Sequence, residues 1–132
     1  MTDPKPPGEL TPERTLTESE YHKHADELMD YLVDTMEGIG EEVELAGFDV
    51  VYASGVLNLS LGDHGTYVIN KQPPNKQIWL SSPVSGPKRF DYSPLAKSWI
   101  CLRTTEDILD LLSKELSALL QRPLKFAYVY DM

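Results

Sequence analysis

The 132-residue sequence predicts an α+β fold: a two-layer sandwich with two terminal helices packed on one face of an antiparallel sheet of about six strands. Three observations support this. An apolar stripe with helical spacing lies near each end of the chain, and short apolar runs separated by turn residues lie between the two stripes. The turns are too short for parallel neighbours, whose crossovers need a dozen residues or more.

The first helix is predicted to begin after Thr17. The run Thr17-Glu18-Ser19-Glu20 fits a capping box, in which the threonine hydroxyl and a glutamate three residues later satisfy the first free amides. Apolar residues then recur every three or four positions from Tyr21 to Ile39. Gly38 and Gly40 are predicted to end this helix.

Six candidate strands follow, at residues 48–52, 56–61, 66–71, 77–81, 88–92 and 98–103. The second helix is expected to start near Thr104 or Thr105, with Glu106 and Asp107 in its first turn, and to stop before Pro123. The apolar tail, residues 124–130, is expected to pack along the two helices.

The rest of the chain adds few constraints. Residues 1–14 are rich in proline and poor in apolar side chains, which predicts a disordered N-terminal lead, with one domain over residues 15–132. The sequence contains no run of 18 apolar residues, so no membrane span is predicted. The single Cys101 excludes an internal disulfide framework and a cysteine-based metal cluster site.

Charge is distributed unevenly along the sequence. The net charge of −9 argues against general nucleic-acid binding, which needs a cationic surface. Between Glu18 and Asp49 there are eleven acids and one base, whereas between Asn70 and Arg103 there are six bases and one acid. The molecule is therefore predicted to have an acidic part and a locally basic part, an arrangement that steers partners and ions.

The first helix carries acids on the side opposite its apolar stripe. Carboxylates three or four residues apart repel one another by roughly 0.2–0.5 kcal/mol per pair, so the series costs about 1–2 kcal/mol in all. One interpretation is a solvated face that serves solubility only, and the other is a site for hard cations or a basic partner. The acidic face, as we call it, consists of Asp26, Glu27, Asp30, Asp34, Glu37 and Glu41.

The stretch from Asn70 to Phe90 combines amides, cations and a tryptophan with four prolines. Alternation in residues 77–81 places Ile78 and Leu80 on one face of a strand and Trp79 on the other, among polar neighbours. Trp79 could be covered by a loop, but tryptophan beside arginine is typical of interface anchors. We therefore expect a protein contact surface on the uncovered face of the sheet.

This central stretch resembles the signature of the frataxin family in its eukaryotic, mitochondrial form. The matching residues are Asn-Lys-Gln-Pro-Pro-Asn-Lys-Gln-Ile-Trp-Leu-Ser-Ser-Pro followed by Ser-Gly-Pro-Lys-Arg-Phe. The runs Ser54-Gly55-Val56-Leu57 and Gly65-Thr66-Tyr67-Val68-Ile69-Asn70 and the acidic first helix match as well. The resemblance covers about residues 16–120. Gly38 is a departure, because many relatives carry another acid there.

The resemblance implies a helix–six-strand–helix sandwich that acts in iron–sulfur cluster assembly in the mitochondrial matrix, with no transit peptide in the printed sequence. The implied partners are the cysteine desulfurase complex and the scaffold protein, with ferrochelatase in haem biosynthesis as a further one. The implied cargo is iron, Fe2+ or Fe3+, on weak carboxylate sites, with no organic cofactor. The implied metal residues are Asp26, Glu27, Asp30, Asp34, Glu37, Glu41 and Asp49, and the implied partner-binding residues are Asn70, Lys71, Gln77, Trp79 and Arg89.

Two functions from different classes remain open at this point. The sequence contains no nucleophile elbow, HExxH, phosphate-binding glycine loop or CxxC, which favours a binding or regulatory module over an enzyme. The resemblance implies that such a module is a non-catalytic activator of sulfur transfer, and we expect it to be a monomer. The alternative is a ferroxidase or iron-storage protein that uses the acidic face and forms metal-driven oligomers. No residue is predicted to be catalytic by itself.

Overall fold

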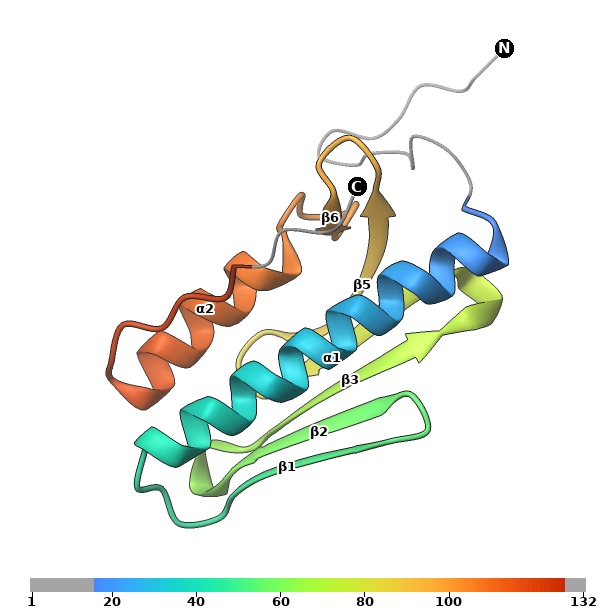
Figure 1. Cartoon of the computed structure of the whole chain (residues 1–132). Coiled ribbons are helices and arrows are strands. Elements are labelled where there is room, and N and C mark those ends of the chain that lie inside the picture. Colours follow the sequence, from blue (N-terminus) through green and yellow to red (C-terminus); the bar gives the residue numbers. More distant parts are fainter. Residues whose placement is uncertain (1–15, 128–132) are drawn as a thin grey trace.

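The computed structural model describes residues 16–127 and shows two layers (Figure 1). Both helices lie over the same face of a six-stranded sheet, as the sequence predicts. The elements are α1 (Glu18–Glu42), β1 (Phe48–Ala53), β2 (Val56–Leu61), η1 (Gly62–His64), β3 (Thr66–Gln72), η2 (Pro73–Asn75), β4 (Gln77–Ser82), β5 (Gly86–Ser93), β6 (Ser98–Ile100) and α2 (Ile108–Leu120).

The sheet is a meander in which every strand pairs antiparallel with its neighbours in the sequence, in the order β1-β2-β3-β4-β5-β6. Because side chains alternate between faces along a strand, the register assigns each residue to a face. Leu59 pairs with Tyr67, and Ile78 pairs with Phe90; all four are buried under the helices. Neither α1 nor α2 lies over the other face, which we call the uncovered face.

The core lies between the helices and the sheet. α1 contributes to it the apolar stripe predicted from the sequence, including Tyr21, Leu28 and Leu32. From α2 it receives Leu112 and Leu116 among others. One continuous core therefore fixes the two helices relative to the strands.

The prediction that Gly38 and Gly40 end the first helix is wrong. The helix continues to Glu42, and Val43 caps it with a backbone bond to Ile39. A Cβ at Gly40 would collide with the Phe48 ring of β1, whereas a Cβ at Gly38 would meet nothing within 4 Å. Gly40 thus serves a close helix–strand approach, a packing requirement that one-dimensional helix-stop rules do not detect.

The junction between β6 and α2 also differs from the prediction. β6 ends at Ile100, and the chain turns through residues 102–104 before Asp107 caps α2 with its side chain. The Asp107 carboxylate accepts from the amides of Leu109 (2.7 Å) and Asp110 (3.3 Å). Glu106 and Asp107 were expected inside the first turn. Both precede α2 instead, and Asp107 is its N-cap, which is also a favoured position for aspartate.

The described part of the tail packs as expected. The amide of Leu124 donates to Ser117, that of Phe126 donates to Ser113, and that of Ala127 donates to the Tyr31 hydroxyl of α1. Residues 128–130 of the predicted tail and the predicted N-terminal lead lie outside the described residues. None of the described helices is both long enough and apolar enough to span a membrane.

Candidate functional site

Four of the predicted partner-binding residues meet on the face of the sheet that α1 and α2 leave uncovered. In the register, Asn70 of β3 pairs with Trp79 of β4, which pairs with Arg89 of β5. Gln77 lies two residues before Trp79 on the same strand and therefore shares its face. We call Asn70, Gln77, Trp79 and Arg89 the sheet cluster.

The indole of Trp79 is held from two sides. Its Nε1–H donates to Gln77 Oε1 at 2.8 Å, and the guanidinium carbon of Arg89 lies 4.6 Å from its ring centroid, within cation–π range. Gln77 in turn donates from Nε2 to Asp91 Oδ2 at 3.2 Å. Burial raises the pKa of Asp91, and this hydrogen bond opposes the rise. The half-buried ring is therefore presented in one orientation.

A groove of about 660 Å³ runs beside the sheet cluster and is lined in part by Asn70, Trp79 and Arg89. Lys88 and Arg103 bring the cations among its described lining residues to three, and none of those described residues is a carboxylate. On a protein with a net charge of −9, this is a local cationic surface. The sequence analysis noted the excess of bases in this region but did not single out Lys88 or Arg103.

The loop that precedes Trp79 is fixed by α1. Tyr21 donates its hydroxyl to the Gln77 carbonyl (2.8 Å) and accepts the Gln72 amide (2.9 Å), so one side chain joins the two ends of the β3–β4 connection. Burial raises the pKa of Tyr21 to about 12, against the opposing effect of the Gln72 amide. Lys76 completes the turn in the left-handed region at φ 52°.

The fifth predicted partner residue, Lys71, lies on the opposite face of the sheet. It pairs with the buried Ile78, and its Nζ is 2.6 Å from Asp26 Oδ1 of α1. Only 14% of its side chain is exposed. The structure therefore separates Lys71 from the sheet cluster and joins it to the acidic face.

The acidic face follows the outer side of α1. Asp26, Asp30, Asp34, Glu37 and Glu41 are exposed and Glu27 is half-buried. Tyr52, which the sequence analysis did not select, adjoins this surface: burial and then the charges of Asp26 and Asp30 raise its pKa.

The structure does not place Asp49 on the acidic face. Asp49 pairs with Ser60, whereas its neighbours Phe48 and Val50 pack against the core. Its side chain therefore points to the uncovered face of the sheet, away from α1.

The carboxylates of α1 do not form a closed metal site. Among residues 16–127, no group of three or more His, Cys, Asp or Glu side chains is arranged to hold a metal ion. Carboxylates spread along a 25-residue helix can offer a hard cation one or two oxygens each, with water filling the other positions. His24, on the same helix, stacks on Tyr92 with ring centroids 4.0 Å apart.

The fold and the two surfaces define a class of small α+β domain: a helix–meander–helix sandwich with an acidic helix and a tryptophan-bearing sheet face. A family model described as a frataxin-like domain matches residues 14–122. The chain belongs to the frataxin family.

Relatives with curated names agree with this assignment. The frataxin homolog of Schizosaccharomyces pombe, named as mitochondrial, is 52% identical over 111 residues, covering 84% of this chain and 70% of that protein. The mitochondrial frataxin of Arabidopsis thaliana is 44% identical over 121 residues, covering 92% of this chain and 65% of that protein. The chain thus belongs to the mitochondrial branch of the family.

Solved structures are similar in fold. Trimeric frataxin from Saccharomyces cerevisiae, described as complexed with ferrous, is 39% identical with a TM-score of 0.66, and the match covers 86% of this chain and 94% of that one. Frataxin from Psychromonas ingrahamii is 25% identical with a TM-score of 0.70, covering 86% of this chain and all of that one. The two-helix, six-strand architecture is therefore that of the family.

Proposed function

We propose that this protein activates iron–sulfur cluster assembly by docking its sheet cluster on the cysteine desulfurase–scaffold complex and accelerating persulfide sulfur transfer. The observation that carries the proposal is the fixed Trp79 indole, held by Gln77 and Arg89 beside a cationic groove on an uncovered sheet face. Desolvated tryptophan and arginine side chains are the usual anchors of protein interfaces. An anchor whose orientation is set before binding loses less conformational entropy on docking.

Iron enters this proposal as cargo. The exposed carboxylates of α1 suit a hard, hydrated cation that exchanges readily, and they equally suit a basic surface on the partner. Family membership and the ferrous complex of the yeast relative support an iron-related role.

The test is the initial rate of sulfide or cluster production by a reconstituted desulfurase–scaffold complex, titrated with this protein and with Trp79→Ala. Removal of an interface anchor weakens binding by about 2 kcal/mol or more, so Trp79→Ala should raise the half-saturating concentration about 30-fold or more. Val51→Ala is the matched control, since Val51 is 49% exposed on the same sheet face but outside the sheet cluster. Equal stimulation by Trp79→Ala and the intact protein would contradict the proposal.

The second candidate function is iron oxidation or storage on the acidic face. The ferrous complex of the yeast relative and its trimeric state favour it. It predicts that Asp30→Ala, Asp34→Ala and Glu37→Ala together abolish Fe(II) oxidation, while Trp79→Ala has no effect. The same charge change at the exposed Glu44, Asp63 and Asp110, which lie outside the acidic face, controls for net charge.

A further inference from the structure

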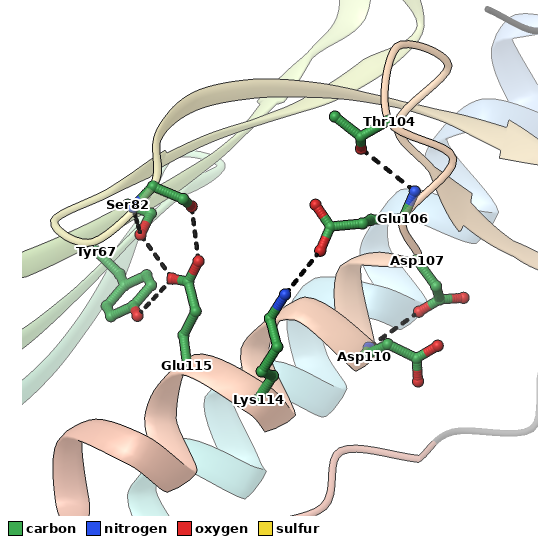
Figure 2. A network of polar contacts seen from close by, with 9 residues as sticks. Tyr67, Ser82, Thr104, Glu106, Asp107, Asp110, Lys114 and Glu115 are labelled. Atoms are coloured by element: carbon green, nitrogen blue, oxygen red, sulfur yellow. Dashed lines mark hydrogen bonds and ion pairs between the residues drawn. The ribbon is translucent and has the colours of Figure 1, made fainter. Parts of the chain in front are cut away.

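A buried carboxylate on α2 reaches across to the sheet and contacts three hydroxyl groups. Glu115 is 6% exposed. Its Oε1 accepts from the Tyr67 hydroxyl at 2.8 Å and from the Ser82 hydroxyl at 2.6 Å, and its Oε2 accepts from the Ser85 hydroxyl at 2.6 Å. Figure 2 shows the side chain extending from α2 toward Tyr67 and Ser82. One helix residue thus contacts β3, β4 and the β4–β5 turn.

The carboxylate accepts hydrogen bonds from Ser82 and Ser85 and so contacts both ends of that turn. The Ser82 hydroxyl donates to Glu115 and accepts from the amides of Val84 (2.9 Å) and Ser85 (3.0 Å). Gly86 follows in the left-handed region, at φ 83°, and pairs with Ser82 to close the hairpin. The shape of the turn is therefore tied to an anchor outside the hairpin.

The anchor acts as an ionised group. Burial by itself raises the pKa of Glu115, but the hydrogen bonds from Ser82, Ser85 and Tyr67 and the charge of Lys88 outweigh it and hold the pKa below its usual value. The carboxylate can therefore accept all three hydroxyl donors at neutral pH.

The turn determines how β4 and β5 align. Turn type and loop length fix the register of a hairpin, and a slip of one residue moves every side chain to the other face. Starting from the Ser82–Gly86 pair, the register runs through Ser81–Pro87 and Leu80–Lys88 to Trp79–Arg89. The cation–π contact of the sheet cluster thus depends on the geometry that Glu115 holds.

A leucine would suit the buried face of α2 at this position, next to Leu111, Leu112 and Leu116, and would avoid the cost of burying a carboxylate. Unlike a leucine, the carboxylate makes directional contacts: its hydrogen bonds form only when the donor hydroxyls point at it, and so they fix the positions of those hydroxyls. We propose that Glu115 is a positioning residue for the sheet cluster: from α2 it fixes the β4–β5 turn and so holds Arg89 over Trp79. The docking consequence of this assignment rests on the proposed function.

Glu115→Gln tests the assignment, because it keeps the side-chain shape but replaces one acceptor oxygen by an NH₂ group. Ser85→Ala removes the Oε2 contact alone and keeps the test usable if Glu115→Gln fails to fold. Glu106→Gln is the matched control: Glu106 precedes α2 and pairs with Lys114 at 3.3 Å, away from the turn (Figure 2).

The first readout is the pair of tryptophan indole N–H signals in ¹H–¹⁵N NMR spectra, assigned with Trp79→Phe. Trp99 is fully buried and serves as an internal reference. We expect Glu115→Gln and Ser85→Ala to shift the Trp79 signal and leave the Trp99 signal in place, and Glu106→Gln to shift neither. An unchanged Trp79 signal in a variant of lowered thermal stability would overturn the proposal and leave Glu115 a purely structural role.

The second readout is the stimulation assay. Faulty positioning should raise the half-saturating concentration, roughly three- to tenfold for a coupled neighbour, while the maximal rate stays the same. An unchanged half-saturating concentration for a variant with a shifted Trp79 signal would contradict the docking consequence. Absence of stimulation by the intact protein would refute the proposed function instead, and the indole signals would still decide the positioning role.

Discussion

The acidic face of α1 and the sheet cluster are built in opposite ways. Along α1, like charges follow one another at helical spacing, and within residues 16–127 Asp26 is the one member of the acidic face with an ion pair. In the sheet cluster, Trp79 is joined to Gln77 by a hydrogen bond and to Arg89 by a cation–π contact. The first surface therefore costs stability and stays adaptable, whereas the second is ordered before any partner arrives.

The difference has a functional meaning. A row of carboxylates that are mostly exposed and outside ion pairs attracts cations and basic surfaces without selecting a geometry. A pre-oriented aromatic anchor selects one geometry. Lys71 of β3 belongs to the first surface rather than to the sheet cluster, because its ammonium group lies against Asp26.

The largest change in stability is expected where α1 meets β1. Gly40→Ala puts a methyl group into the Phe48 ring and should lower the free energy of unfolding by about 1–3 kcal/mol, because the rigid ring must move. Gly38→Ala, two residues earlier in the same helix, meets open space and should raise it by about 0.5–1 kcal/mol through helix propensity. Urea denaturation measures both, and equal effects of the two substitutions would show that close packing does not hold the acidic helix in place.

A second change tests how firmly the sheet cluster is supported. Tyr21→Phe removes the hydroxyl that joins Gln72 to Gln77 and should lower the free energy of unfolding by about 1–2 kcal/mol, since a partly buried amide and a partly buried carbonyl both lose a partner. The Trp79 indole signal should broaden or shift at the same time, because Gln77 holds that ring. A loss of stability with an unperturbed indole would mean that the sheet cluster is ordered without help from α1.

The smallest effect is expected from the acidic face. Asp30→Asn, Asp34→Asn and Glu37→Gln together remove five like-charge pairs and should raise the free energy of unfolding by roughly 1 kcal/mol at low salt. The gain should shrink as sodium chloride is added, because salt screens exposed charges. Thermal unfolding over a range of ionic strengths measures it, and a loss of stability would show that these carboxylates make stabilising contacts.

Most of the fold could be read from the sequence because its signals are local. Helical spacing identified the buried stripe of α1, and alternation identified β2 with its observed bounds and β4 to within one residue. The errors lie where a distant contact overrides a local preference. Gly40 stays helical because Phe48 packs against it, and β6 stops at Ile100 because the chain must turn before Asp107 can cap α2.

The candidate site divides in the same way. Periodicity placed Trp79 on the polar side of its strand, and the motif that resembles the family singled out its neighbours. Sequence alone did not separate Lys71 from Asn70, one residue earlier, although the two side chains point to opposite faces. Nor did it select Glu115. The only sign of this residue in the sequence is a charged side chain three and four positions after leucines, which places it on the apolar side of α2.

The sequence by itself determined the class of fold, the polarity of the first helix and the family, because spacing, charge and a long motif are properties of the chain read in order. Only the tertiary structure decided which of those residues share a surface. Strand register and helix packing bring residues far apart in sequence within a few ångströms, as they do for Trp79 with Arg89, Lys71 with Asp26, and Glu115 with Ser82. Such contacts depend on the packed core, which no single segment encodes.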